Sequence, residues 1–305
     1  EDYADTEAFR DAREKLCAYR KKRAALLTDD KRLTAWNALM IAAFARAGFV
    51  LGRSDYLAAA RRALGFIESS LTRPDGRLFV RWRDGEAAGD GFLDDYAFLG
   101  CALLALYDAT LEPEYLEKAE RCASLMCRLF EDTETGGFYL TPEGAERLAL
   151  RPKETYDGAM PSGNSAAGYV LMRLGQLTGK PEWLERGARQ LRFLAADALL
   201  YPSAHCFALT AAMLALYPSR EVVVVSRDAQ IREELLRRMG RLYAPNMALL
   251  LKTPENAALL ERLAPFTAAY PIPETGARIY LCRNRSCDSP FEDFDELERR
   301  LLLAD

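Results

Sequence analysis

Two groups of carboxylates in this sequence could exchange protons with a bound substrate. Asp94 and Asp95 are adjacent at the predicted start of a helix, and Asp157 lies in a loop punctuated by glycine and proline. Positioned carboxylates are the groups that general acid–base chemistry at a sugar requires. We interpret Asp95 and Asp157 as catalytic candidates and Asp94 as a substrate-binding one. The alternatives are structural, because Asp at a helix start is a common N-cap and Asp-Gly is a common turn.

Other polar and aromatic residues near these carboxylates could bind the same ligand. They offer amide, hydroxyl, imidazole or ring groups to it: Trp36, Asn37, Tyr96, Ser162, Asn164 and His205. The aromatic rings could stack on a sugar face, although aromatic residues at such positions are more often part of a core. The amides could equally tie loops together. Because the chain has 1 His, it cannot supply a histidine pair for catalysis.

The cysteines allow a redox role at one place in the chain. Cys282 and Cys287 form a C-x4-C pair after a predicted strand, and they could be a redox-active disulfide or two ordinary buried thiols. The chain has 7 Cys, an odd number that does not favour a disulfide framework. We expect no metal, because two cysteines and one distant histidine do not make a zinc site. We expect no nucleotide cofactor either, because no glycine-rich loop follows the first predicted strand.

The chain up to residue 217 has the apolar periodicity of amphipathic helices. The pattern predicts helices at 5–26, 34–51, 54–71, 94–110, 113–130, 162–178, 181–196 and 203–216. Four of them begin with a suitable N-cap: Thr34, Ser54, Ser162 and Ser203. The candidate carboxylates and amides therefore stand at or near the beginnings of helices.

These helices are organised as an internal repeat. Tyr56, Tyr115 and Trp183 each stand in the first turn of a helix that follows a tight turn, at separations of 59 and 68 residues. Repeats of this length are typical of stacked helical hairpins. Equivalent positions 20 residues earlier fall near the start of the first helix of each hairpin. We expect these N-termini to form one mouth, whose free N–H groups suit a polar or anionic ligand.

The pattern changes after residue 217. Continuous β-branched and aliphatic runs predict strands at 221–226, 247–251 and 277–281, with helices at 229–242, 255–263 and 294–303 between and after them. Strands that alternate with helices indicate a small parallel α/β layer. We therefore predict a mainly α protein: a partial (α/α) toroid of about four helical hairpins over 1–217, followed by a small α/β subdomain over 218–305.

Composition limits the surroundings and partners of the chain. The 305 residues carry 41 Lys+Arg and 45 Asp+Glu, and 50% of them are hydrophobic. This balance supports a globular core and argues against binding to a phosphate backbone, so we expect no nucleic-acid partner. No apolar run is expected to reach the length of a membrane span, and the N-terminus does not have the pattern of a signal peptide. The expected location is cytoplasmic, with no membrane partner.

Four stretches together resemble a known family. They are DDKRLTAWNALMI at 29–41, GFLDDYAFL at 91–99, RPKE through YDGAMPSGNS at 151–165, and YLCRNRSC at 280–287. They are similar to motifs of the spermatogenesis-associated protein 20 family. These are thioredoxin-fused proteins whose helical toroid is related to six-hairpin glycosidases and acylglucosamine epimerases. The matches run in order over nearly the whole chain.

The resemblance implies a toroid with a sugar-binding cleft and a thioredoxin-like domain as a partner. The chain departs from the family pattern, since it lacks the thioredoxin-like domain and has four inner helices where a closed ring has six. It is therefore expected to be the C-terminal part of such a protein, with a cleft that is open or completed by a second chain in a homo-oligomer. The histidine-pair mechanism of the related epimerases does not carry over.

Two functions follow as hypotheses. The first is a carbohydrate-active or carbohydrate-binding module, hydrolase- or isomerase-like, with its cleft at the N-terminal ends of the inner helices. The alternative is a non-catalytic scaffold or a redox-coupled module that acts with a thioredoxin-like domain through Cys282 and Cys287. The residues themselves name neither the sugar nor the choice between hydrolysis and isomerisation.

Overall fold

A computed structural model describes residues 7–23, 28–145, 150–228, 230–242, 244, 246–283 and 286–302. The chain divides into two compact units, residues 1–31 and residues 32–305. The first unit contains α1 (Glu7–Lys21), an amphipathic helix none of whose residues is buried. The helix predicted at 5–26 is confirmed over this range, and its first two and last three residues lie outside the described residues.

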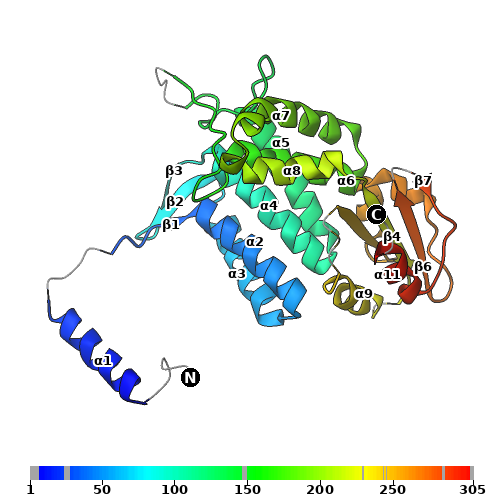
Figure 1. The fold of residues 1–305 in the computed structure, drawn as a ribbon, viewed down its shortest axis with the longest axis horizontal. Helices are drawn as coiled ribbons and strands as arrows, with labels where there is room; N and C mark the ends of the chain where they lie inside the picture. Colours follow the sequence, from blue (N-terminus) through cyan, green and yellow to red (C-terminus); the bar gives the residue numbers. More distant parts are fainter. Residues whose placement is uncertain are drawn as a thin grey trace. The chain divides into compact units, whose positions relative to one another are not determined.

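The second unit is built from helical hairpins (Figure 1). Three are complete: α2 (Thr34–Leu51) with α3 (Ser54–Ser70), α4 (Leu93–Thr110) with α5 (Pro113–Phe130), and α6 (Gly163–Thr178) with α7 (Pro181–Leu200). Gly52 and Gly179 end α2 and α6 in the left-handed conformation, which lets the chain reverse within two residues. A 3-10 turn, η2 (Pro202–Ala204), leads into a fourth inner helix, α8 (Cys206–Leu216), and a strand follows where an outer helix would stand.

The inner helices pack against one another in chain order, α2 on α4, α4 on α6 and α6 on α8, and each outer helix packs on its own inner partner. Helices α4 and α6 are buried along most of their length, because they have a neighbour on every side. Tyr96, Phe98 and Tyr107 are among the largest fully or almost fully buried side chains. This arrangement confirms the predicted fold class, a mainly α partial (α/α) toroid.

Helix α2 lies at one end of this series. Its inner face buries Ala38, Ile41 and Ala45, whereas Trp36 and Met40 are exposed. Within the described residues, α2 is the one helix whose length and composition would allow it to cross a membrane. The expectation concerned uninterrupted apolar runs and did not allow for α2, whose apolar residues are interrupted by a single charged residue, Arg46.

A small antiparallel sheet lies beside the N-terminal ends of α2 and α4. Its strands follow the order β1 (Arg32–Leu33), β2 (Phe79–Arg83) and β3 (Glu86–Asp90). The hydroxyl of Thr34 in the first turn of α2 donates to the carbonyl oxygen of Phe79 at 2.6 Å, which attaches the sheet to the helix. Thr34 and Ser54 are the first helical residues rather than the N-caps expected of them.

The α/β part forms a four-stranded sheet in the order β5-β4-β6-β7. Its strands are β4 (Arg220–Ser226), β5 (Met247–Lys252), β6 (Ala277–Arg283) and β7 (Ser286–Cys287), and its helical segments are α9 (Ile231–Met239), α10 (Ala257–Leu263), η3 (Pro265–Ala269) and α11 (Phe294–Leu302). β4 is parallel to β5 but antiparallel to β6. The predicted all-parallel layer is therefore wrong, because an apolar run indicates a buried strand but not its direction.

This sheet is attached to the C-terminal ends of the inner helices. The hydroxyl of Tyr107 in α4 donates to the carbonyl oxygen of Leu249 at 3.0 Å. Arg173 in α6 is buried, donates to the carbonyl oxygen of Met247 at 3.0 Å and forms an ion pair with Asp108 at 3.0 Å. The hairpins and the α/β part thus belong to one compact unit. The N-terminal ends of the inner helices lie at the other end of the bundle (Figure 1).

Candidate functional site

The first turns of the four inner helices are joined side by side. The backbone N–H of Ala35 in α2 donates to Asp95 of α4 at 2.8 Å. Asp94 of α4 lies against the start of α6, where a Cβ placed on Gly163 would stand 2.4 Å from its Oδ1. The loop before α6 reaches α8, because Asp157 accepts the N–H of Phe207 at 2.7 Å. We call these four first turns, with the loop at 151–162, the rim; the expected convergence of the N-termini is observed.

Asp95 caps two helices at once. One carboxylate oxygen accepts the N–H of Ala35 and the other accepts the N–H of Phe92, both at 2.8 Å. The side chain is 1% exposed. Burial raises the pKa of Asp95 to about 7, and the amides of Phe92 and Ala35 oppose that rise. The carboxylate of Asp95 therefore has the geometry of a helix cap. This geometry does not favour a catalytic role for Asp95, which stays a prediction.

Asp157 is held in a similar way. Its Oδ1 accepts the N–H of Ser162 at 2.8 Å, and its Oδ2 accepts the N–H groups of Phe207 and Ala208 at 2.7 and 3.0 Å. Its own N–H donates to the carbonyl oxygen of Ala204. The carboxylate therefore occupies the N-terminal end of α8, where free N–H groups and the helix dipole attract a negative charge.

Asp94 differs from both. It is half-buried, and burial together with the nearby charge of Glu154 raises its pKa to about 6, against the opposing effect of the Gly163 amide. Position 163 has no room for a side chain beside this carboxyl group. Glu154 is exposed in the loop before α6. Sequence reasoning did not select Glu154, although it stands three residues before Asp157 in one of the family-like stretches.

Three of the predicted binding residues are internal. Asn164 is fully buried, and its amide makes hydrogen bonds with the backbone of Phe138 and Glu154 and with Gln190. Ser162 is the N-cap of α6, as predicted, and its Oγ accepts the N–H of Ser165. Tyr96 is 2% exposed, its hydroxyl accepts the N–H of Leu78, and burial raises its pKa to about 12.

The other three differ in accessibility. Trp36 is 59% exposed on the first turn of α2. Asn37 is half-buried, and its amide donates to the carbonyl oxygen of Leu33 at 2.7 Å. His205 is buried, and its Nδ1 lies 2.9 Å from the carbonyl oxygen of Tyr201. Since a carbonyl oxygen only accepts, Nδ1 is the donor in this hydrogen bond. Ser203 lies in η2, so it is not the expected cap of α8.

The two redox candidates are covalently linked. Cys282 and Cys287 form a disulfide between β6 and β7, and the other five cysteines are free thiols. Among the described residues, no group of His, Cys, Asp and Glu side chains is arranged to hold a metal ion.

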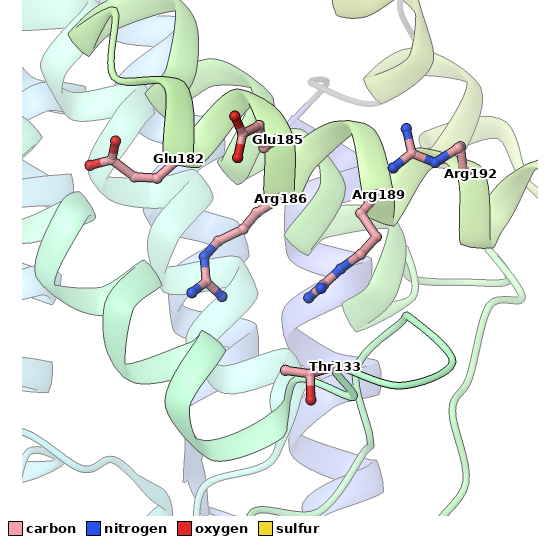
Figure 2. Close-up of a pocket in the computed structure, with 6 residues that line it drawn as sticks. All are labelled: Thr133, Glu182, Glu185, Arg186, Arg189 and Arg192. Carbon is pink, nitrogen blue, oxygen red and sulfur yellow. The ribbon is translucent and has the colours of Figure 1, made fainter.

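A charged pocket of about 530 Å³ lies along α7 (Figure 2). Figure 2 shows the guanidinium groups of Arg186 and Arg189 directed toward Thr133. Both donate to the carboxylate of Glu131, whose side chain is 6% exposed at the C-terminal end of α5. The two arginines thus neutralise the buried carboxylate of Glu131 and the negative C-terminal end of the α5 dipole. Sequence reasoning did not select them, although three arginines spaced three apart on one helix were the available signal.

Comparisons with known proteins identify the relatives of the chain. No family model matches it. It is 33% identical over 301 residues to spermatogenesis-associated protein 20 of Rattus norvegicus, and 32% identical over 302 residues to the protein of the same name from Mus musculus. Each alignment covers 95% of this chain. The chain is a homologue of spermatogenesis-associated protein 20. The resemblance drawn from the four motifs is thereby confirmed.

The chain spans 38% of the length of these spermatogenesis-associated protein 20 relatives. It is also 26% identical over 302 residues to an uncharacterised protein of Caenorhabditis elegans, covering 94% of this chain and 40% of that one.

Parts of this chain are similar to solved structures of sugar epimerases, an isomerase and a mannanase. Cellobiose 2-epimerase from Bacillus thermoamylovorans is 17% identical with a TM-score of 0.46, over 55% of this chain and 45% of that one. A D-mannose isomerase is 15% identical with a TM-score of 0.41, over 53% and 44%. A GH76 α-mannanase from Bacteroides thetaiotaomicron is 18% identical with a TM-score of 0.43, over 62% and 53%.

Proposed function

We propose that the rim binds a carbohydrate and that Asp94 exchanges a proton with it. One observation carries this proposal. Of the three aspartates predicted for the site, Asp95 and Asp157 each have both oxygens held by backbone amides, whereas Asp94 is half-buried at the meeting point of α4 and α6. We therefore assign the proton-exchanging role to Asp94 rather than to the catalytic candidates Asp95 and Asp157.

The pKa of Asp94 suits this role. A pKa of about 6 means that the carboxyl group of Asp94 is protonated in part of the molecules near neutral pH. A carboxylic acid of raised pKa beside an ionised carboxylate is an arrangement that can donate and accept protons at a sugar oxygen. Glu154 supplies the second carboxylate, since its charge contributes to the shift at Asp94. The reaction class is proton transfer, hydrolase- or isomerase-like.

Exposed aromatic side chains give the rim a means of holding a sugar ring. Trp36 in α2 and Tyr156 in the loop before α6 are both 59% exposed, and Phe92 at the start of α4 is 41% exposed. The CH groups of a pyranose face pack against such rings, while its hydroxyls need polar partners such as the carboxyl groups of Asp94 and Glu154. The rim offers both kinds of group.

Saturation-transfer NMR of the 305-residue chain with neutral mono- and oligosaccharides, cellobiose and mannose included, tests binding. Wild type is expected to give a signal that Trp36→Ala weakens. Asp94→Asn is expected to keep binding and lose turnover of the bound sugar, since the amide cannot donate the same proton. The control is Asp84→Asn, an exposed aspartate in the β2–β3 turn. Unchanged turnover in Asp94→Asn, or silence across the panel, would overturn the proposal.

A further inference from the structure

The disulfide between Cys282 and Cys287 has one buried and one exposed sulfur position. The two residues are partners in the β6–β7 ladder. Cys282 is 4% exposed in β6, which lies between β4 and β7, whereas Cys287 is exposed on the edge strand β7. A thiol from outside the protein can therefore reach Cys287 and not Cys282. Since thiol–disulfide exchange proceeds by attack on one sulfur and release of the other, this asymmetry fixes its direction.

A phenol stands beside both sulfurs. The hydroxyl oxygen of Tyr270 lies 3.3 Å from Sγ of Cys287 and 3.6 Å from Sγ of Cys282. Disulfide sulfurs carry no hydrogen, so the phenol is the donor. Its position is fixed by packing against Tyr280, with ring centroids 4.4 Å apart, and by Lys252, whose ammonium group donates to the Tyr270 carbonyl oxygen at 2.9 Å.

Burial and the neighbouring acidic groups keep this phenol protonated. Burial is the main reason that the pKa of Tyr270 is raised, and Tyr280 and Glu221 add to the rise. Glu221 is the partner of Cys282 in the β4–β6 ladder. Its carboxylate would disfavour a thiolate on Cys282, because two negative charges would then face each other. A hydrogen bond from Tyr270 would offset that repulsion, since donors to a charged acceptor stabilise the charged form.

We propose that the Cys282–Cys287 pair is a thiol–disulfide exchange site, at which an external dithiol attacks Cys287 and Tyr270 stabilises the departing thiolate of Cys282. A new S–S bond forms between the reagent and Cys287 as the Cys287–Cys282 bond breaks. The electron pair goes to Cys282 Sγ, which takes a proton from solvent. The second thiol of the reagent then attacks the mixed disulfide and releases Cys287. The protein disulfide gains two electrons, and the dithiol loses two.

The rate of reduction by dithiothreitol at pH 7 tests the role of Tyr270. Thiols are trapped with N-ethylmaleimide at successive times and counted by mass spectrometry of the peptide that contains both cysteines. Tyr270→Phe keeps the ring packing and is expected to slow reduction about two- to tenfold, the effect of one hydrogen bond. Tyr280→Phe keeps the neighbouring ring and serves as the control, because within the described part of the chain Tyr270, and not Tyr280, forms the hydrogen bonds with the two sulfurs. Equal rates in the two variants would overturn the role of Tyr270.

Three further variants test the opposing charge and the direction of attack. Glu221→Gln removes the opposing charge and is expected to speed reduction, whereas a slower rate would contradict the proposed thiolate on Cys282. With glutathione disulfide as the probe, Cys282→Ser is expected to form a mixed disulfide at Cys287. Cys287→Ser is expected to leave Cys282 unlabelled while the exposed thiol of Cys206 still reacts. Labelling of Cys282 as readily as Cys287 would overturn the direction of attack.

Discussion

The carboxylate of Asp95, in the first turn of α4, accepts the backbone N–H of Ala35, in the first turn of α2, at 2.8 Å. One side chain thus closes its own helix end and that of its neighbour, since its second oxygen accepts the N–H of Phe92. The first four N–H groups of a helix have no partner within the helix. Asp95 supplies partners across two helices, and so it fixes where the inner helices begin relative to one another.

Replacing Asp95 with alanine tests this role. The change leaves the N–H groups of Ala35 and Phe92 without acceptors in a partly buried place, so the free energy of unfolding should fall by about 1–3 kcal/mol. Urea denaturation monitored by circular dichroism measures the loss. Asp84→Asn, at an exposed turn whose left-handed backbone asparagine also adopts, should cost less than about 0.5 kcal/mol. Similar costs for the two variants would contradict the capping role of Asp95.

The second prediction concerns the pH dependence of Asp94. Its folded pKa of about 6 lies above the ordinary value of 3.8, so the folded state holds the proton more tightly than the unfolded state does. The resulting stabilisation is complete below pH 4 and is lost as the pH rises through 6. Wild type should therefore lose about 1 kcal/mol relative to Asp94→Asn between pH 4 and 7, a value reduced for solvent screening.

Glu154→Gln tests the cause of that shift. The change removes a negative charge from the surroundings of Asp94, so the pKa of Asp94 should fall toward its ordinary value while burial still holds it above. Titration of the side-chain carboxyl carbon by NMR measures the pKa directly. Glu143→Gln, on the exposed loop after α5, is the control and should leave the titration unchanged. An Asp94 pKa that does not move in Glu154→Gln would remove Glu154 from the proposed pair.

Gly163→Ala tests the close approach of α6 to α4. A Cβ at this position would lie 2.4 Å from Oδ1 of Asp94 and 2.8 Å from Cγ of Leu93, so the two helix starts must separate. We expect a loss of about 1–3 kcal/mol in stability and a displaced Asp94 carboxyl group. Gly65→Ala in α3 is the matched control, because nothing lies within 4 Å of its Cβ position. That change should stabilise the protein by up to about 1 kcal/mol. A harmless Gly163→Ala would contradict the packing described.

The helical part of the fold follows closely from the sequence. The bounds of α2 and α5 agree at both ends with the prediction, because periodicity sets the length and a glycine or a proline marks the turn. Helix α8 begins three residues later than predicted, since Pro202 starts a 3-10 turn that local patterns do not separate from a helix. The direction of β6 was not predictable either, because it depends on how the chain returns after η3.

The position of the site could be predicted from the sequence, but the role of each side chain in it could not. The repeat alone indicates that the inner helices begin together, and the structure agrees. Which carboxylate stays available to a ligand depends on hydrogen-bond partners that lie far along the chain. Asp95 binds an amide 60 residues away, and Asp157 binds one 50 residues away. No local pattern contains those contacts, and the same is true of the influence of Glu154 on Asp94.

The last prediction concerns Asp157, which connects the loop before α6 to the first turn of α8. In Asp157→Ala the amides of Phe207 and Ala208 lose their acceptor, and their hydrogen exchange should become roughly tenfold faster, as expected for the loss of a helix cap. Ser162→Ala is the reciprocal control, because it removes the acceptor of the Ser165 amide at α6 and should leave α8 protected. If exchange at Phe207 is unchanged in Asp157→Ala, the side chain is not needed as a cap, and its carboxylate returns as a candidate for contact with the ligand.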